Sequence, residues 1–184
     1  MDIEQHYIDL YKVMHQDKRN YQGISLMKET PNIANIVLET NSHTVLDYGC
    51  GKGNQYIESH LNILFHIPDD NIFMYDPGFD EHKKLPDRKF DGVISTDVME
   101  HIHQDECDKV LEEIFAYAEH SVFFTISCNP AKKHFPDGTN YHVNCKPEEW
   151  WFATIKRLKP KHLKVWLIFP SFKGIIKYDK EETR

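Results

Sequence analysis

The sequence predicts an α/β fold in which helices cover a mostly parallel sheet. Short apolar segments typical of buried strands alternate with amphipathic helical segments along the chain. A glycine-rich turn connects the first predicted strand to its helix, as in open α/β sheets that bind ligands at their strand ends. The chain has 184 residues, 40% of them apolar, which suits one globular domain with a full core.

The N-terminal region predicts two helices. The first helix has one apolar face, formed by Ile3, Tyr7, Leu10, Tyr11 and Met14. A second helix is expected to begin near Thr30 as N-cap, with Pro31 at its first position and with Ile33, Ile36 and Val37 turned inward. We expect residues 1–42 to form a helical cover, residues 43–178 to form the α/β domain and residues 179–184 to fray.

The remaining elements follow from hydrophobic periodicity. Strands are predicted at 44–49, 71–76, 90–96, 121–127, 164–169 and, as a short last strand, 174–178. Helices are predicted at 54–64, 105–118 and 146–158. Trp151, Ile155 and Leu158 share one face of the last helix, so we expect Trp151 to belong to the core.

Composition excludes several classes. No segment approaches the roughly 18 consecutive apolar residues of a membrane helix, and no signal peptide is evident, so a cytoplasmic protein is expected. The four cysteines form no CxxC pair, which favours reduced thiols over a zinc site. The net charge is −7 without a basic stripe, so duplex DNA is not an expected partner. The oligomeric state stays open.

The stretch VLDYGCGKGNQY places three alternating glycines after one carboxylate: Asp47, then Gly49, Gly51 and Gly53. A dinucleotide fingerprint needs a third glycine where Asn54 stands, and a phosphate-binding P-loop needs a Gly-Lys-Ser/Thr ending. Both nucleotide patterns are therefore incomplete. A nucleotide-dependent oxidoreductase remains a less favoured alternative.

The loop resembles motif I of class I S-adenosylmethionine-dependent methyltransferases. Asp76 follows the next strand, and FDGVISTDVMEHI, residues 90–102, is similar to the segment that follows in this family. The resemblance implies a Rossmann-like, doubly wound, mostly parallel sheet of the class I methyltransferase type. Only about 13 residues separate Asp76 from Phe90, too few for a helix and a further strand, so we expect the fold to be shortened between its second and fourth strands.

The resemblance also implies the cofactor, S-adenosylmethionine, with S-adenosylhomocysteine as product. Asp47 would help to hold the ammonium group, Asp76 the ribose hydroxyls, and Asp97 with the following backbone the methionine side. The shortening leaves the adenine contact open, with Phe79 as a candidate for stacking. The expected cofactor residues are Asp47, Gly49, Cys50, Gly51, Gly53, Asp76, Pro77, Thr96, Asp97 and Val98.

The methyl acceptor is expected to meet the loops after the third and fourth strands. His142 and His101 are the candidate catalytic residues, followed by His134. The segment around His142 also resembles small methyltransferase-like proteins of tailed bacteriophages. The tetrapeptide of amino-methylating DNA enzymes is absent, and Cys128 precedes Asn129-Pro130 instead of following a proline.

A metal site is not expected, because His101 and His103 lie two apart and share no face of a strand or helix. The predicted function is methyl transfer from S-adenosylmethionine to a small-molecule or single-group acceptor, at oxygen, nitrogen or carbon, by in-line displacement. The alternative is a non-catalytic cofactor-binding or interaction module on a shortened methyltransferase fold.

Overall fold

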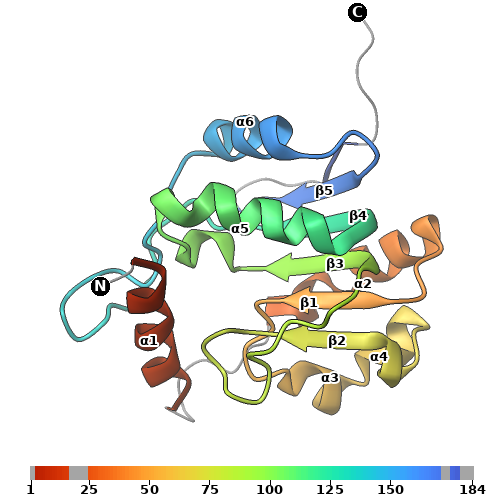
Figure 1. The fold of residues 1–184 in the computed structure, drawn as a ribbon, viewed down its shortest axis with the longest axis horizontal. Coiled ribbons are helices and arrows are strands. Elements are labelled where there is room, and N and C mark those ends of the chain that lie inside the picture. The colour runs from red at the N-terminus through yellow and green to blue at the C-terminus, as the bar shows by residue number, and fades with distance from the viewer. Residues whose placement is uncertain (1–2, 17–24, 171–174, 179–184) are drawn as a thin grey trace, which may run out of the picture.

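The computed structural model describes residues 3–16, 25–170 and 175–178, and it contains one six-stranded sheet (Figure 1). The strand order is β2-β1-β3-β4-β5-β6, with the first five strands parallel and β6 antiparallel to β5. The strands are β1 Val45–Tyr48, β2 Ile72–Tyr75, β3 Phe90–Thr96, β4 Ala118–Thr125, β5 Lys164–Ile168 and β6 Ile176–Tyr178.

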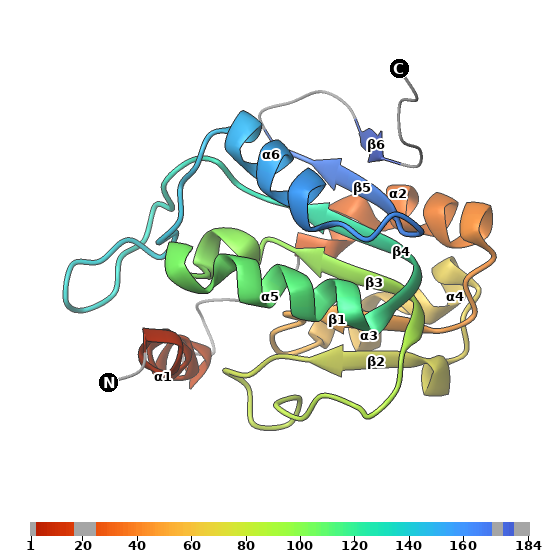
Figure 2. The ribbon, with the colours of Figure 1, turned by 45° about the horizontal axis from the view of Figure 1, so that its top comes forward.

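Helices cover both faces of the sheet (Figures 1 and 2). They are α1 Ile3–Gln16, α2 Ser25–Thr40, α3 Asn54–Ser59, α4 Leu61–Phe65, α5 Gln104–Tyr117 and α6 Glu148–Leu158, with short 3-10 turns at Asp69–Asn71 and Met99–His101. The expected doubly wound α/β fold is confirmed by this arrangement.

Two apolar clusters hold the layers together. One joins α5 and α6 to the sheet through residues such as Leu111, Ile114 and the fully buried Trp151, which belongs to the core as predicted. The other joins α2 and α4 to the opposite face through Ile33 and Phe65. Since α2, α4, α5 and α6 bury apolar side chains against the sheet, a packed core holds the strands in place.

The segment 77–89 contains no helix or strand, so β2 is the edge of the sheet. This confirms the expected shortening of the fold. The guanidinium of Arg88 lies over the ring of Phe73 in this edge strand, 4.2 Å from its centroid.

Two predicted elements differ from the structure. The second helix begins at Ser25, because the fully buried Leu26 extends the core-facing side of the helix toward the N-terminus. Pro31 therefore lies inside the helix. The Thr30 hydroxyl donates a hydrogen bond to the Leu26 carbonyl, one turn earlier. The helix predicted at 54–64 is interrupted at His60, which adopts a left-handed conformation between α3 and α4. Across the described part of the chain, no helix is long and apolar enough to cross a membrane.

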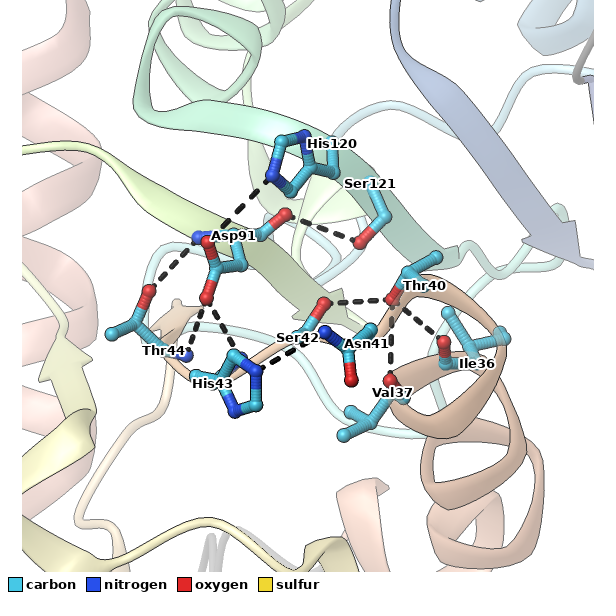
Figure 3. A network of polar contacts seen from close by, with 10 residues as sticks. All are labelled: Ile36, Val37, Thr40, Asn41, Ser42, His43, Thr44, Asp91, His120 and Ser121. Atoms are coloured by element: carbon cyan, nitrogen blue, oxygen red, sulfur yellow. Dashed lines mark hydrogen bonds and ion pairs between the residues drawn. The ribbon is translucent and has the colours of Figure 1, made fainter.

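Polar contacts fasten the amino ends of the strands (Figure 3). One oxygen of the Asp91 carboxylate accepts hydrogen bonds from the backbone N–H groups of His43 and Thr44, at 2.7 and 2.9 Å. These bonds fix the turn that leads into β1 and so position the first strand.

Candidate cofactor and acceptor site

The glycine loop begins where β1 ends, at the carboxyl edge of the sheet. Gly49, Gly51 and Gly53 all have positive φ, at 87°, 59° and 64°. The backbone N–H of Gly49 donates to the Tyr75 carbonyl at 2.7 Å, which ties the loop to β2. A Cβ atom on Gly49 would lie 2.3 Å from a methyl group of Val98, so glycine is required for the loop to pass this close.

Asp47 lies beneath the loop and is 1% exposed. One of its carboxylate oxygens accepts a hydrogen bond of 2.9 Å from the Tyr56 hydroxyl, while the other has no partner among the described residues. Burial raises the pKa of Asp47 to about 7, against the opposing effect of the Tyr56 hydrogen bond. A buried carboxylate with an open acceptor position suits a nearby cation.

Asp76 follows β2 and faces the loop. Its two carboxylate oxygens accept backbone hydrogen bonds from Gly51 at 2.9 Å and from Gly78 at 2.8 Å. The imidazole of His15, on α1, lies 3.8 Å from the same carboxylate. Asp76 thus connects the glycine loop, the segment after β2 and the N-terminal helix.

Asp97 follows β3 in a left-handed conformation, with φ of 54°. Its carboxylate accepts a hydrogen bond of 2.9 Å from the Thr125 hydroxyl, and its backbone N–H donates to the Thr125 carbonyl at 3.0 Å. The end of β4 therefore fixes both the backbone and the side chain of Asp97 at the carboxyl edge.

His101 lies in the 3-10 turn after Asp97. Its Nδ1 is 2.9 Å from the Tyr141 carbonyl and 3.1 Å from the Tyr11 hydroxyl. Burial lowers the pKa of His101 to about 4, helped by the neighbouring His142. The ring is consequently neutral near pH 7, and its Nε2 can act as an acceptor.

Two cavities open at this edge of the sheet. The first is about 100 Å³ and is covered by α1, which contributes Tyr7, Tyr11 and His15 to its lining. The second is about 520 Å³ and lies between the glycine loop and the segment after β2, lined by Lys52, Asn54 and Phe79 among others. The two cavities share His15 and Gly78, so they meet beside Asp76.

Some of the predicted site residues line the first cavity, and the others do not. The first cavity is lined by Gly49, Asp76, Pro77, Asp97, Val98 and His101. The residues predicted for the site that do not line it are Asp47, Cys50, Gly51, Gly53, Thr96 and His142. His142 packs edge-on against His101, with ring centroids 4.9 Å apart.

Sequence reasoning missed several residues of the site. Tyr11 and His15 come from α1, where Tyr11 was assigned only to an apolar face. Glu100 and Asn144 are buried beside the histidines, and each has side-chain polar atoms without a partner in the described structure. The adjacent Glu100 and His101 in the short segment between the predicted strand and helix would have been the signal for Glu100.

The comparisons with known proteins decide the family. The methyltransferase-domain family matches residues 16–166, which is most of the chain. The protein belongs to the methyltransferase-domain family. The resemblance to class I S-adenosylmethionine-dependent methyltransferases is thereby confirmed.

A solved structure supports the fold of this methyltransferase domain. The chain is similar to the protein in a "DhpI-SAH complex structure", with a TM-score of 0.57, 13% identity and coverage of 96% of each chain. No curated protein matches the sequence. At this identity the structural match supports the shared architecture alone.

Proposed function

We propose that the protein transfers a methyl group from S-adenosylmethionine to a small-molecule or single-group acceptor. The observation that carries this proposal is the meeting of the glycine loop, Asp76 and Asp97 at one edge of the sheet, next to two cavities that share His15 and Gly78 in their walls. The family assignment points to the same chemistry. When bound, S-adenosylmethionine supplies a methyl group activated by its sulfonium.

The residues present fit this cofactor. Asp76 lines the smaller cavity and contacts His15 and Gly78, which line both cavities, and a carboxylate there can accept hydrogen bonds from two ribose hydroxyls. Asp47 lies beneath the loop and lines neither cavity, so when ionised it would favour the ammonium of the methionine portion as a nearby charge. Phe79 lines the larger cavity and offers a ring for the adenine.

The acceptor would occupy the smaller cavity under α1. Tyr11 donates a hydrogen bond of 2.7 Å to the Tyr141 carbonyl and thereby fixes α1 next to His101. Because its low pKa makes His101 a weak base, we infer that it orients the acceptor through Nε2. His142 supports the His101 ring from behind, which makes it a positioning candidate.

The shortened segment 77–89 favours a second candidate, a module that binds the cofactor without turnover. The two candidates differ in one experiment. The protein is incubated with methyl-labelled S-adenosylmethionine and a fractionated metabolite extract, and label transfer is followed with time. Catalytic label transfer that is lost in Asp76→Asn supports the enzyme. Saturable cofactor binding without transfer to any fraction supports the module.

A matched variant keeps this assay interpretable. Asp70→Asn alters an exposed carboxylate in the 3-10 turn before β2 and should leave label transfer unchanged. Both variants are compared by thermal melting, so that a loss of transfer in Asp76→Asn alone reports on the site.

A further inference from the structure

We propose that Glu100, His101 and His142 form a binding site for a divalent first-row transition-metal ion at the wall of the acceptor cavity. Each residue can offer one ligand atom so that the three atoms lie within 4.8 Å of one another. With metal–ligand distances of about 2.1 Å, two ligands of a tetrahedral ion are about 3.4 Å apart. The three side chains would therefore have to move closer together, by up to about 1.4 Å between a pair of ligand atoms, to bind one ion.

The hydrogen bonds of the two histidines prepare both rings as ligands. The Nδ1 of His101 faces the Tyr141 carbonyl at 2.9 Å, and the Nδ1 of His142 faces the Asn129 carbonyl at 2.6 Å. A carbonyl oxygen only accepts, so each Nδ1 carries the proton and each Nε2 has a free lone pair. Donation of the remote N–H to a backbone carbonyl is the usual support of a metal-bound histidine.

Glu100 completes the donor set. It is fully buried, and one carboxylate oxygen accepts a hydrogen bond of 3.0 Å from the backbone N–H of Ser127. The other oxygen is buried and has no partner within the described residues. A buried carboxyl oxygen without a hydrogen-bond partner costs free energy, and a cation bound to it and to the two imidazoles would offset that cost.

Asn144 adds to this unmatched polarity. Its backbone N–H donates to the Glu100 carbonyl at 3.0 Å. Both polar atoms of its side-chain amide are buried, and in the described part of the chain neither has a hydrogen-bond partner. The amide oxygen is a further potential ligand on the segment that carries His142.

The donor types select the kind of ion. Two imidazoles and one carboxylate suit Zn²⁺, Fe²⁺, Co²⁺ or Mn²⁺ better than Mg²⁺ or Ca²⁺, which prefer oxygen ligands throughout. His101 also lines the acceptor cavity, so an ion on its Nε2 would lie near a bound acceptor. The role of the ion rests on the proposed function: the ion would take the place of the direct contact between His101 Nε2 and the acceptor, and it would bind an acceptor oxygen and lower the pKa of that group.

This set differs from the histidine pair considered on sequence spacing. His103 caps α5, where its ring accepts a hydrogen bond from the Asp105 backbone, and it contributes no ligand atom to the cluster. The third ligand comes instead from His142, which the loop after β4 brings back to His101. A second carboxylate-histidine group, Asp91, Glu119 and His120, is largely exposed, and Asp91 already serves the turn in Figure 3.

The test is Co²⁺ titration of tag-free protein that has first been stripped with a chelator. Visible d–d absorption reports coordination, and calorimetry gives the stoichiometry. We expect one equivalent to bind saturably in wild type, and His142→Gln to weaken binding more than about tenfold. His120→Gln, in the exposed group, should bind as wild type does. Absence of saturable absorption in wild type, or equal binding by His142→Gln, would overturn the proposal.

A second variant and a cofactor titration make the Co²⁺ result easier to interpret. Glu100→Gln keeps the shape of the side chain and an acceptor oxygen for the Ser127 N–H, and it should also weaken Co²⁺ binding. If Glu100→Gln does not fold, the result for His142→Gln alone tests the metal site. S-adenosylhomocysteine is titrated into the same samples. Cofactor binding without Co²⁺ binding would overturn only the metal-site proposal, whereas Co²⁺ binding without cofactor binding would overturn only the proposed function.

Discussion

The imidazole of His15 in α1 lies 3.8 Å from the carboxylate of Asp76 at the end of β2. This contact places the N-terminal helix over the acid that would hold the ribose. The cavity beneath α1, which we propose for the acceptor, is only about 100 Å³, whereas pockets for small-molecule ligands are typically about 300 Å³ or larger. We therefore infer that α1 moves when a ligand enters.

The first prediction concerns this movement. Tyr11→Phe removes the hydrogen bond to the Tyr141 carbonyl that fastens α1, worth about 1 kcal/mol. The association rate of S-adenosylhomocysteine, measured by stopped-flow fluorescence, should rise several-fold. Tyr7→Phe keeps the ring that stacks on His103 and should leave the rate unchanged. An unaltered rate in Tyr11→Phe would mean that α1 does not limit entry.

The second prediction concerns the buried acid under the loop. The pKa of Asp47 is about 7 in the fold, against 3.8 for an ordinary aspartate. The contribution of Asp47 to the free energy of unfolding is therefore fully present below about pH 4 and is lost as the pH rises through 7, by up to about 4 kcal/mol. The free energy of unfolding of Asp47→Asn, relative to that of wild type, should therefore be higher at pH 8 than at pH 5.

Urea unfolding of both proteins at the two pH values measures this difference. The same acid should affect binding in the opposite direction, because only the ionised carboxylate would attract the cofactor ammonium in the proposed site. Affinity for S-adenosylhomocysteine should increase from pH 6 to pH 8 in wild type and less so in Asp47→Asn. A stability difference between the two proteins that is independent of pH would contradict the raised pKa.

The third prediction separates two costs of adding a Cβ atom at a glycine with positive φ: backbone strain, and a clash with neighbouring side chains. Gly49 and Gly138 have nearly the same φ, 87° and 88°. A Cβ on Gly49 would lie 2.3 Å from Val98, whereas none of the non-neighbouring atoms lies within 4 Å of a Cβ on Gly138. Gly138→Ala should cost about 1 kcal/mol from strain alone, and Gly49→Ala about 3 kcal/mol.

Chemical denaturation gives both values directly, and titration with S-adenosylhomocysteine reports on the loop. Gly49→Ala should also weaken cofactor binding, while Gly138→Ala should not. Equal losses of stability would show that Val98 yields and that the close approach is unimportant.

The sequence allowed the sheet and the loop to be predicted because their signals are local. Strand β1, the three glycines and Asp76 lie within 32 residues, and each is marked by apolar runs or turn chemistry. The start of α2 was missed because burial of Leu26 extends the helix beyond the Thr30-Pro31 signal. Tertiary packing outweighed a local capping pattern in this case.

The candidate acceptor site was less predictable because its contacts are distant in the chain. Tyr11 meets Tyr141 across 130 positions, and His101 meets the Tyr141 carbonyl across 40. Neither separation leaves a periodic pattern in the sequence. Glu100 and His142 become neighbours only when the loop after β4 folds back over the 3-10 turn, so spacing arguments about His101 and His103 could not reveal them.

The most direct test of the account is calorimetric titration of S-adenosylhomocysteine into wild type, Asp76→Ala, Asp76→Asn and the control Asp70→Asn. We predict one saturable site in wild type and in Asp70→Asn. Both Asp76 variants should bind about 10–100-fold more weakly, because charge-assisted hydrogen bonds to the ribose are lost. Absence of binding by wild type, or unchanged affinity in folded Asp76 variants, would contradict the cofactor site.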